Sequence, residues 1–213
     1  MSIKLHVFPP SPRAFKVLAV ASYLRLDYEV CLVDFAKGTQ KTPEFTALNP
    51  NQRMPVLEED GFVLWESNAI TQYLAAKRPE SGLLPSDPVQ RVLVNQWQCW
   101  DLAHWDPACA MLIFENVVKQ LFGIGPPDAV KVAEGEERFH KVAAVLDGQL
   151  TRNRFVVGES PTVADFSIGA ALNLTTAARL PVQRYENVVR WHKTLADLPG
   201  WRKSAVSPPC DAL

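Results

Sequence analysis

The chain has no run of basic residues, and its charge is almost balanced. It carries 22 Lys and Arg against 23 Asp and Glu, for a formal net charge of −1 at pH 7. Proteins that follow a nucleic-acid backbone carry clustered positive charge. We therefore expect no nucleic-acid partner.

Long apolar runs are also absent. The N-terminal segment MSIKLHVFPP is short and interrupted by polar residues and prolines, unlike a signal peptide. No stretch approaches the roughly 20 apolar residues that a membrane-spanning helix needs. We therefore expect a cytoplasmic protein with no membrane partner.

Cysteines are few and scattered. The four of them, Cys31, Cys99, Cys109 and Cys210, show no CxxC spacing. Disulfide frameworks and zinc sites both depend on recurrent, closely spaced cysteines. The sequence therefore predicts neither, and we expect no metal.

What the chain does contain is enough apolar material for a large core. It has 213 residues, of which 47% are hydrophobic, and domains usually have about 100–200 residues. Short apolar runs at 3–8 and 28–33 flank a helical pattern at 13–26, and 42–48 reads as a short helical turn. Further helical patterns follow at 89–120, 129–150, 162–178 and 185–198.

The change of pattern falls at a segment dense in Pro, Ser and Gly, RPESGLLPSDP, which indicates a linker. We therefore predict a small α/β domain at 1–78, a linker at 79–88 and an all-helical domain at 89–213.

The most informative stretch, NPNQRMPVLEEDGFVLWESNAITQYL, begins at Asn49. Asp60-Gly61 between two apolar runs predicts a β-hairpin. Met54-Pro55 stands just before the first strand, as either a turn proline or a cis peptide. Glu66-Ser67 stands where the second strand gives way to a helix, a position that favours anions.

Ser11, in FPPSPRAFKV, lies between the first strand and the first helix. One interpretation is an N-cap followed by proline at the first helical position. The other is a hydroxyl that donates to an anion at the helix N-terminus. The two are compatible.

The strand–turn–strand–helix, with a proline at one end and an acid–hydroxyl pair at the other, resembles the glutathione-binding domain of glutathione transferases. YEVCLVDFAKGTQKTPEFTALNP is similar to the family as well, in its Lys-Gly step and its PEF…LNP run. Ser11, four residues before Phe15, is placed like the serine of the theta, phi and bacterial serine-type members. The resemblance implies a thioredoxin-like N-terminal domain, βαβ–ββα, followed by an all-α C-terminal domain.

The resemblance also implies roles for single residues. Ser11 would be the catalytic residue, donating a hydrogen bond to the sulfur of glutathione. Ser67 and Glu66 would hold the γ-glutamyl end, Lys41 and Gln40 the glycyl carboxylate, and Arg53 either end. Met54 would present its backbone to the peptide, with a cis Met54–Pro55 bond. The implied glutathione-binding residues are Gln40, Lys41, Arg53, Met54, Pro55, Glu66 and Ser67.

Three features depart from the family pattern. Gln52 occupies a position where the family usually has glycine, so the turn lacks glycine's freedom to adopt positive φ. Asn68 stands where arginine often follows the Glu-Ser pair. Prolines at positions 9, 10 and 12 stiffen the loop around Ser11.

In the helical half, Thr162-x-x-Asp165 is a capping pair, which we assign to stability. Aromatic residues at helical spacing around residue 100 are either plain core or part of an acceptor-substrate pocket. The candidate pocket residues are Phe8, Pro10, Trp100, His104, Trp105, Ala108 and Leu112.

The resemblance implies a detoxifying glutathione transferase that adds glutathione, its co-substrate, to a small hydrophobic electrophile. It implies a homodimer and no permanently bound cofactor. A glutathione-dependent peroxidase and a non-catalytic glutathione- or ligand-binding protein are the alternatives.

Overall fold

The structure is a computed structural model that describes residues 2–205. Contacts divide the chain into two compact units. Of the described residues, one unit comprises 2–81 together with 198–205, and the other is Gly82–Asp197. The first boundary falls inside the predicted linker, whereas the segment after residue 197 was predicted to belong to the helical domain.

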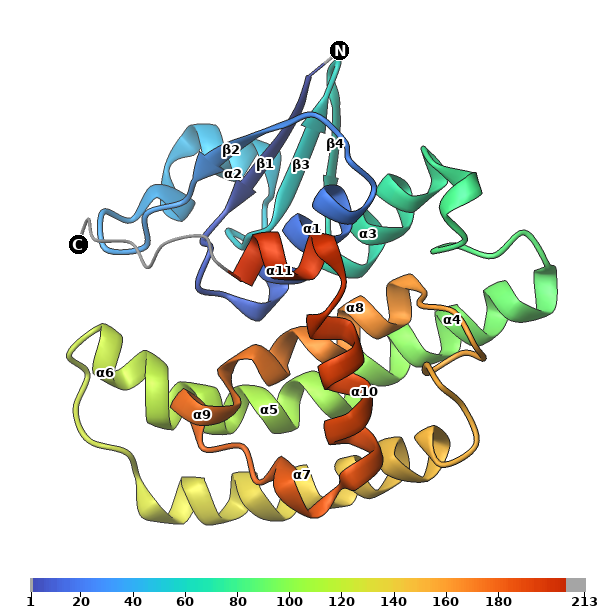
Figure 1. Ribbon diagram of the computed structural model, residues 1–213. Helices are drawn as coiled ribbons and strands as arrows, with labels where there is room; N and C mark the ends of the chain where they lie inside the picture. Colours follow the sequence, from blue (N-terminus) through green and yellow to red (C-terminus); the bar gives the residue numbers. More distant parts are fainter. Residues whose placement is uncertain (1, 206–213) are drawn as a thin grey trace. The chain divides into compact units, whose positions relative to one another are not determined.

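The first unit is built on a four-stranded sheet with strand order β2-β1-β3-β4 (Figure 1). β1 (Ile3–Val7) runs parallel to β2 (Tyr28–Leu32) and antiparallel to β3 (Val56–Glu59). β4 (Phe62–Trp65) pairs with β3 across the predicted hairpin. Asp60 and Gly61 at its turn have φ of 49° and 85°, as a type I′ turn requires.

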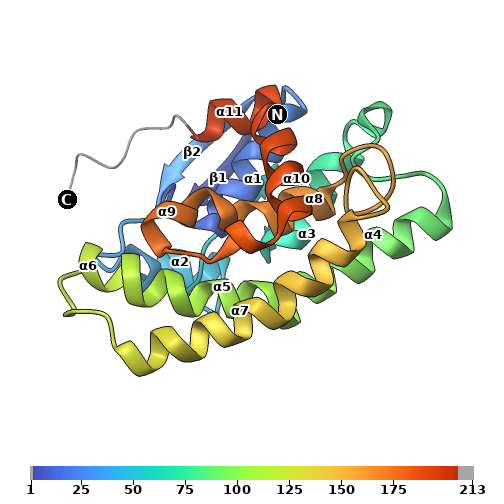
Figure 2. The same cartoon turned by 60° about the horizontal axis from the view of Figure 1, so that its bottom comes forward.

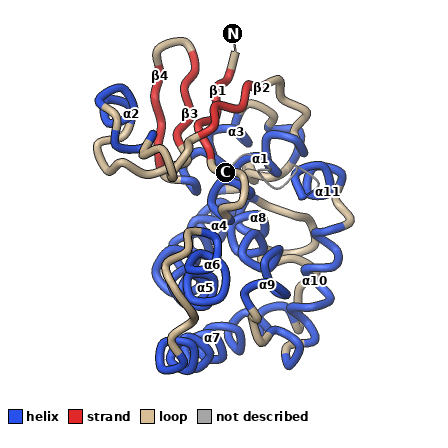
Figure 3. The backbone as a smooth tube through the Cα atoms, turned by 90° about the vertical axis from the view of Figure 1, so that its left-hand side faces the viewer, coloured by secondary structure: helices blue, strands red, loops and turns tan. Residues whose placement is uncertain are grey.

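Helices cover both faces of this sheet. α1 (Pro12–Tyr23) and α3 (Ser67–Ala76) pack together on one face, and α2 (Pro43–Leu48) lies on the other (Figure 3). Phe45 of α2 closes a small core with Val33 and Val56. The predicted βαβ–ββα, thioredoxin-like arrangement is confirmed.

The last helix, α11 (Pro199–Ala205), joins the first unit because it packs on α1. Trp201 is buried, and its ring centroid lies 4.9 Å from that of Phe15. A Cβ on Gly200 would stand 2.4 Å from the backbone nitrogen of Tyr23, so only glycine permits this approach. The sequence pattern predicts neither this helix nor its packing on α1.

The second unit is all-helical, as predicted (Figure 2). α4 (Pro88–Trp100), α5 (Asp106–Ile113) and α6 (Lys119–Leu121) form one long rod, joined by π-helical turns at Asp101–Trp105 and Phe114–Val118. The remaining helices are α7 (Ala129–Leu150), α8 (Val163–Gly169), α9 (Thr175–Ala178) and α10 (Glu186–Ala196). The predicted helix at 162–178 is interrupted by a 3₁₀ segment, Ala170–Leu174.

The described residues were searched for membrane-spanning helices and for clusters of metal ligands. Within residues 2–205, no helix is both long and apolar enough to cross a membrane, and no three His, Cys, Asp or Glu side chains cluster as metal ligands. Cys31, Cys99 and Cys109 are free thiols. Cys210 lies outside the described residues.

Candidate active site

The segments that carry the predicted site residues lie at one end of the sheet, where β1 and β4 finish and β3 begins. His6 of β1 pairs with Val56 at the start of β3, and Val56 pairs with Trp65 at the end of β4. Three segments therefore lie at the same end of the sheet. They are the loop after β1, the Met54-Pro55 step before β3 and the Glu66-Ser67 step after β4. The loop that follows β2 leaves there too, because Val33 donates its backbone N–H to Val7 O at 2.8 Å.

Ser11 is the N-cap of α1. Its Oγ accepts a hydrogen bond from the backbone N–H of Arg13 at 3.2 Å, with Pro12 in the first helical position. A hydroxyl that accepts one bond still has its own O–H to donate. The residue is half-buried, so the N-cap role and the donor role coexist in one side chain.

Met54 and Pro55 are joined by a cis peptide bond, as the resemblance implied. Pro55 is buried and Met54 is half-buried, packed against the small core under α2. The Met54 backbone lies just before β3, at the end of the sheet where β1 and β4 finish.

Glu66 and Ser67 form the start of α3. Glu66, the N-cap residue, has φ 73° and ψ 112° and makes no side-chain capping bond. A non-glycine residue at such a φ is strained, and strain of this kind recurs at binding sites. Ser67 is 3% exposed, and the first turn contains no acidic residue. The N–H groups at this helix end therefore suit an external anion.

Comparison with known proteins decides the family. The glutathione S-transferase N-terminal domain model matches residues 1–76, and the C-terminal domain model matches residues 105–199. Glutathione S-transferase 3 of Zea mays is 34% identical over 213 residues, which cover 97% of this chain and 95% of that protein. The chain belongs to the glutathione S-transferase family.

Other relatives and solved structures agree. A glutathione S-transferase of Hyoscyamus muticus is 32% identical, covering 96% of this chain and 98% of its own. The structure of a Nilaparvata lugens delta-class glutathione transferase superposes with a TM-score of 0.83 at 31% identity, covering 95% of this chain and 92% of that one. A Pseudomonas fluorescens glutathione S-transferase reaches 0.85 at 31% identity, covering 93% and 96%. The chain is therefore a glutathione transferase enzyme with glutathione as its co-substrate.

The loop that presents Met54 in this transferase is held by Asn49. Asn49 is 3% exposed, and its side-chain amide donates to the carbonyl of Arg53 at 2.6 Å. Its Oδ1 accepts from the backbone N–H of Asn51 at 3.0 Å. The sequence does not reveal this role of Asn49, because the bond to Arg53 depends on the fold of the loop.

Gln52 adopts the left-handed conformation that glycine would have provided, with φ 54°. Its Nε2 donates to Thr46 Oγ1 at 3.3 Å. Since left-handed backbone costs a non-glycine residue about 1–2 kcal/mol, we expect Gln52→Gly to leave stability unchanged or raise it by up to about 1 kcal/mol, and Gln52→Val to lower it by more than 1 kcal/mol. Urea unfolding measures both, and a destabilised glycine variant with an unaffected valine variant would contradict the argument.

The two residues predicted to meet the glycyl carboxylate lie in the 3₁₀ turn Thr39–Lys41. Lys41 is exposed, as is Arg53. Gln40 is half-buried, and its Oε1 is a buried atom without a hydrogen-bond partner within residues 2–205. An unsatisfied buried amide oxygen is uncommon.

The acceptor-pocket candidates in the helical unit divide by burial. Trp105, Ala108 and Leu112 are buried. The Trp105 ring stacks on Trp100 at 6.0 Å, and its Nε1–H donates to Ile168 O at 2.8 Å. These contacts make Trp105 part of the core. Trp100 is half-buried and His104 exposed, so their surfaces remain accessible.

In the first unit, Phe8 is half-buried and Pro10 is exposed. The Phe8 ring meets the ring of Phe35 edge to face, with centroids 5.4 Å apart. All seven acceptor-pocket assignments remain predictions.

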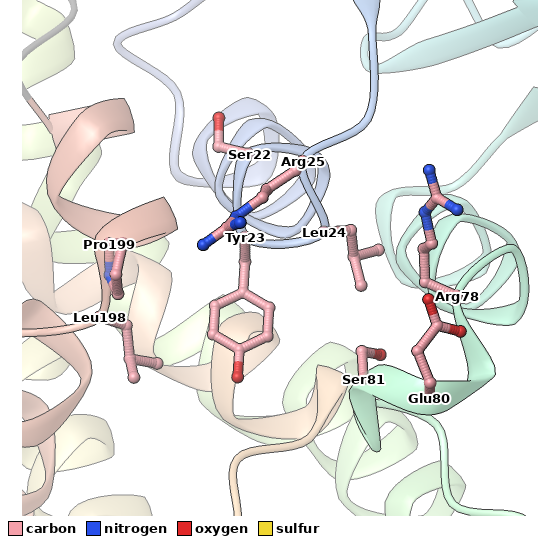
Figure 4. Close-up of a pocket in the computed structure, with 9 residues that line it drawn as sticks. All are labelled: Ser22, Tyr23, Leu24, Arg25, Arg78, Glu80, Ser81, Leu198 and Pro199. Atoms are coloured by element: carbon pink, nitrogen blue, oxygen red, sulfur yellow. The ribbon is translucent and has the colours of Figure 1, made fainter.

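A cavity of about 590 Å³ lies elsewhere in the first unit (Figure 4). It lies at the C-terminal end of α1, whereas Ser11 caps the other end, about 18 Å away for a helix of this length. None of the predicted site residues lines it. Its lining residues are Ser22, Tyr23, Leu24, Arg25, Arg78, Glu80, Ser81, Leu198 and Pro199.

Proposed function

We propose that this protein is a serine-type glutathione transferase in which the Ser11 hydroxyl stabilises glutathione as its thiolate. The observation that supports the proposal is the position of Ser11. Its Oγ caps α1 near the end of the sheet, and its hydroxyl can still donate a hydrogen bond. The thiol proton passes to solvent, and the thiolate attacks the electrophilic carbon of a small hydrophobic substrate. A carbon–sulfur bond forms, and a leaving group departs or an acceptor atom takes up the electron pair.

The magnitudes are sufficient without a general base. A free thiol has a pKa of about 8.5, and lowering it by about 2 units requires about 2.7 kcal/mol of preferential binding of the anion. A charge-assisted hydrogen bond supplies about 1.5–3 kcal/mol. The N-terminus of α1 adds about 0.3–1 kcal/mol.

The other groups at this end of the sheet hold the tripeptide. The γ-glutamyl carboxylate binds at Ser67, where α3 begins, and Glu66 takes the amino group. Met54 offers its backbone, and Lys41 with Gln40 takes the glycyl end, with Arg53 in support. The chain acts as a cytoplasmic homodimer, as the family resemblance implies, and the accessible faces of Trp100 and His104 contribute to the acceptor site.

The test combines binding and turnover. Calorimetry measures glutathione uptake, and a pH titration of thiolate absorbance measures the pKa of the bound thiol. We expect binding with an acid-shifted pKa, together with turnover of a chloronitrobenzene or an isothiocyanate. Hydroperoxide reduction alone would support the peroxidase alternative. Binding without any turnover would instead identify a non-catalytic glutathione-binding protein.

A further inference from the structure

Lys16 is a buried cation that the proposed mechanism does not use. It lies in α1 and is 2% exposed, which is rare for a lysine. Its Nζ donates a hydrogen bond to Oδ1 of Asn68 at 3.0 Å. Burying an ammonium group is unfavourable unless it is hydrogen-bonded, and an apolar side chain would fill the same space without that penalty.

The bond joins the second turn of α1 to the first turn of α3. Lys16 follows Ser11 by five positions, and side chains on a helix lean toward its N-terminus. Asn68 directly follows Ser67 at the start of α3 and is 5% exposed. Its backbone carbonyl accepts a hydrogen bond from Thr71 Oγ1 at 2.8 Å, which anchors it within α3.

We propose that Lys16 is a positioning residue that, through Asn68, sets the spacing between the N-termini of α1 and α3. This inference rests on the proposed function. Ser11 at one terminus meets the sulfur, and Ser67 at the other meets the γ-glutamyl carboxylate of the same peptide. Both groups are engaged together only at one separation of the two helix ends, and misplacement by about 1 Å can cost about 100-fold in rate.

The identity of residue 68 fits this role. The family often has arginine after the Glu-Ser pair, whereas this chain has asparagine. The side-chain oxygen of an asparagine accepts a hydrogen bond from the Lys16 ammonium group, while an arginine side chain has only donors to offer. Lys16 and Asn68 are thus a matched donor and acceptor.

The test is Lys16→Met, which keeps the length of the side chain and removes the donor. We expect the KM for glutathione to rise about tenfold and the pKa of the bound thiol to move toward that of free glutathione, because the peptide is held less accurately. Lys16→Arg keeps a cationic donor and should recover most of both quantities. Asn68→Ala should reproduce the Lys16→Met effect, and the double variant should add little to it.

Lys77→Met is the matched control, because Lys77 also ties α3 to the rest of the unit, but at its other end. Lys77 Nζ lies 2.6 Å from Glu59 Oε2. Burial acts to raise the pKa of Glu59, but the hydrogen bonds from Lys77 and Tyr73 outweigh it and hold that pKa below its usual value. The control should therefore lose an ion pair and some thermal stability, with the KM for glutathione and the thiol pKa unchanged.

Two results would overturn the inference. One is a folded Lys16→Met or Asn68→Ala variant whose KM and thiol pKa match the parent protein. The other is a Lys77→Met variant that shifts both quantities as strongly. If Lys16→Met does not fold, Asn68→Ala and Lys16→Arg decide the question alone. Failure of the proposed function is a separate result, seen when the parent protein itself shows no acid-shifted thiol.

Discussion

Replacing Asp165 by alanine is expected to lower the free energy of unfolding by about 4 kcal/mol, the larger of two expected stability losses at helix caps in this chain. The carboxylate is fully buried. It accepts hydrogen bonds from the backbone N–H groups of Val156 and Thr162, both at 2.8 Å. The Thr162 hydroxyl donates at 3.0 Å and the Trp191 indole at 2.9 Å. Truncation leaves these buried donors unsatisfied, at about 1–3 kcal/mol each before relaxation.

Asp128→Ala provides the matched control. Asp128 is also an aspartate at the start of a helix, where its Oδ1 accepts from the N–H groups of Val130 and Lys131 at 2.9 and 3.3 Å. It is exposed, so water replaces the lost bonds, and we expect a loss of about 1 kcal/mol. Denaturant unfolding of the two variants measures the difference. Equal losses would show that Asp165 acts as an ordinary cap.

The sequence identified Asp165 but underestimated its surroundings. Thr162 and Asp165 stand three residues apart, so their capping relation can be read locally, and it implied about 1–2 kcal/mol. Trp191 lies 26 residues further along the chain and donates only because α10 packs on α8. No local pattern reports a bond of that kind.

The same division between local and distant signals runs through the fold. The hairpin at Asp60-Gly61, the N-cap at Ser11 and the start of α3 at Ser67 each depend on a few neighbouring residues, and each was predictable. α11 was not, because its assignment to the first unit depends on Trp201 meeting Phe15 across most of the chain. Gln52 shows a third case, in which tertiary context imposes a backbone conformation that the residue type disfavours.

The parts of the candidate site that lie next to a strand could be predicted from the local sequence. Each of its segments lies next to the end or the beginning of a strand, namely Ser11, Met54-Pro55 and Glu66-Ser67. Strand pairing brings them to the same end of the sheet. The role of Lys16 could not be predicted, because a single lysine within an apolar helical run looks like a position exposed to solvent. Only the packing of α1 on α3 reveals that it reaches Asn68.

Replacing Ser11 by alanine is the change with the largest expected effect on activity. Alanine keeps the helix but removes the hydroxyl that donates a hydrogen bond to sulfur in the proposed mechanism. A charge-assisted hydrogen bond of about 1.5–3 kcal/mol corresponds to a fall of about 10- to 150-fold in kcat/KM and to a rise of about 1–2 units in the pKa of the bound thiol. Steady-state rates at pH 6.5 and the thiolate titration measure the two effects independently.

The pH dependence separates this role of Ser11 from its role as a cap. Below the pKa of the free thiol, the variant has less thiolate than the parent protein, so the difference in rate is greatest at low pH. As the pH rises past about 8.5, both proteins hold mostly thiolate and the difference shrinks. Loss of the cap alone would lower stability by about 1 kcal/mol and leave the rate ratio independent of pH. Ser22→Ala, at the far end of the same helix, should change neither the rate nor its pH profile. A pH-independent ratio for Ser11→Ala would assign the thiolate to another donor.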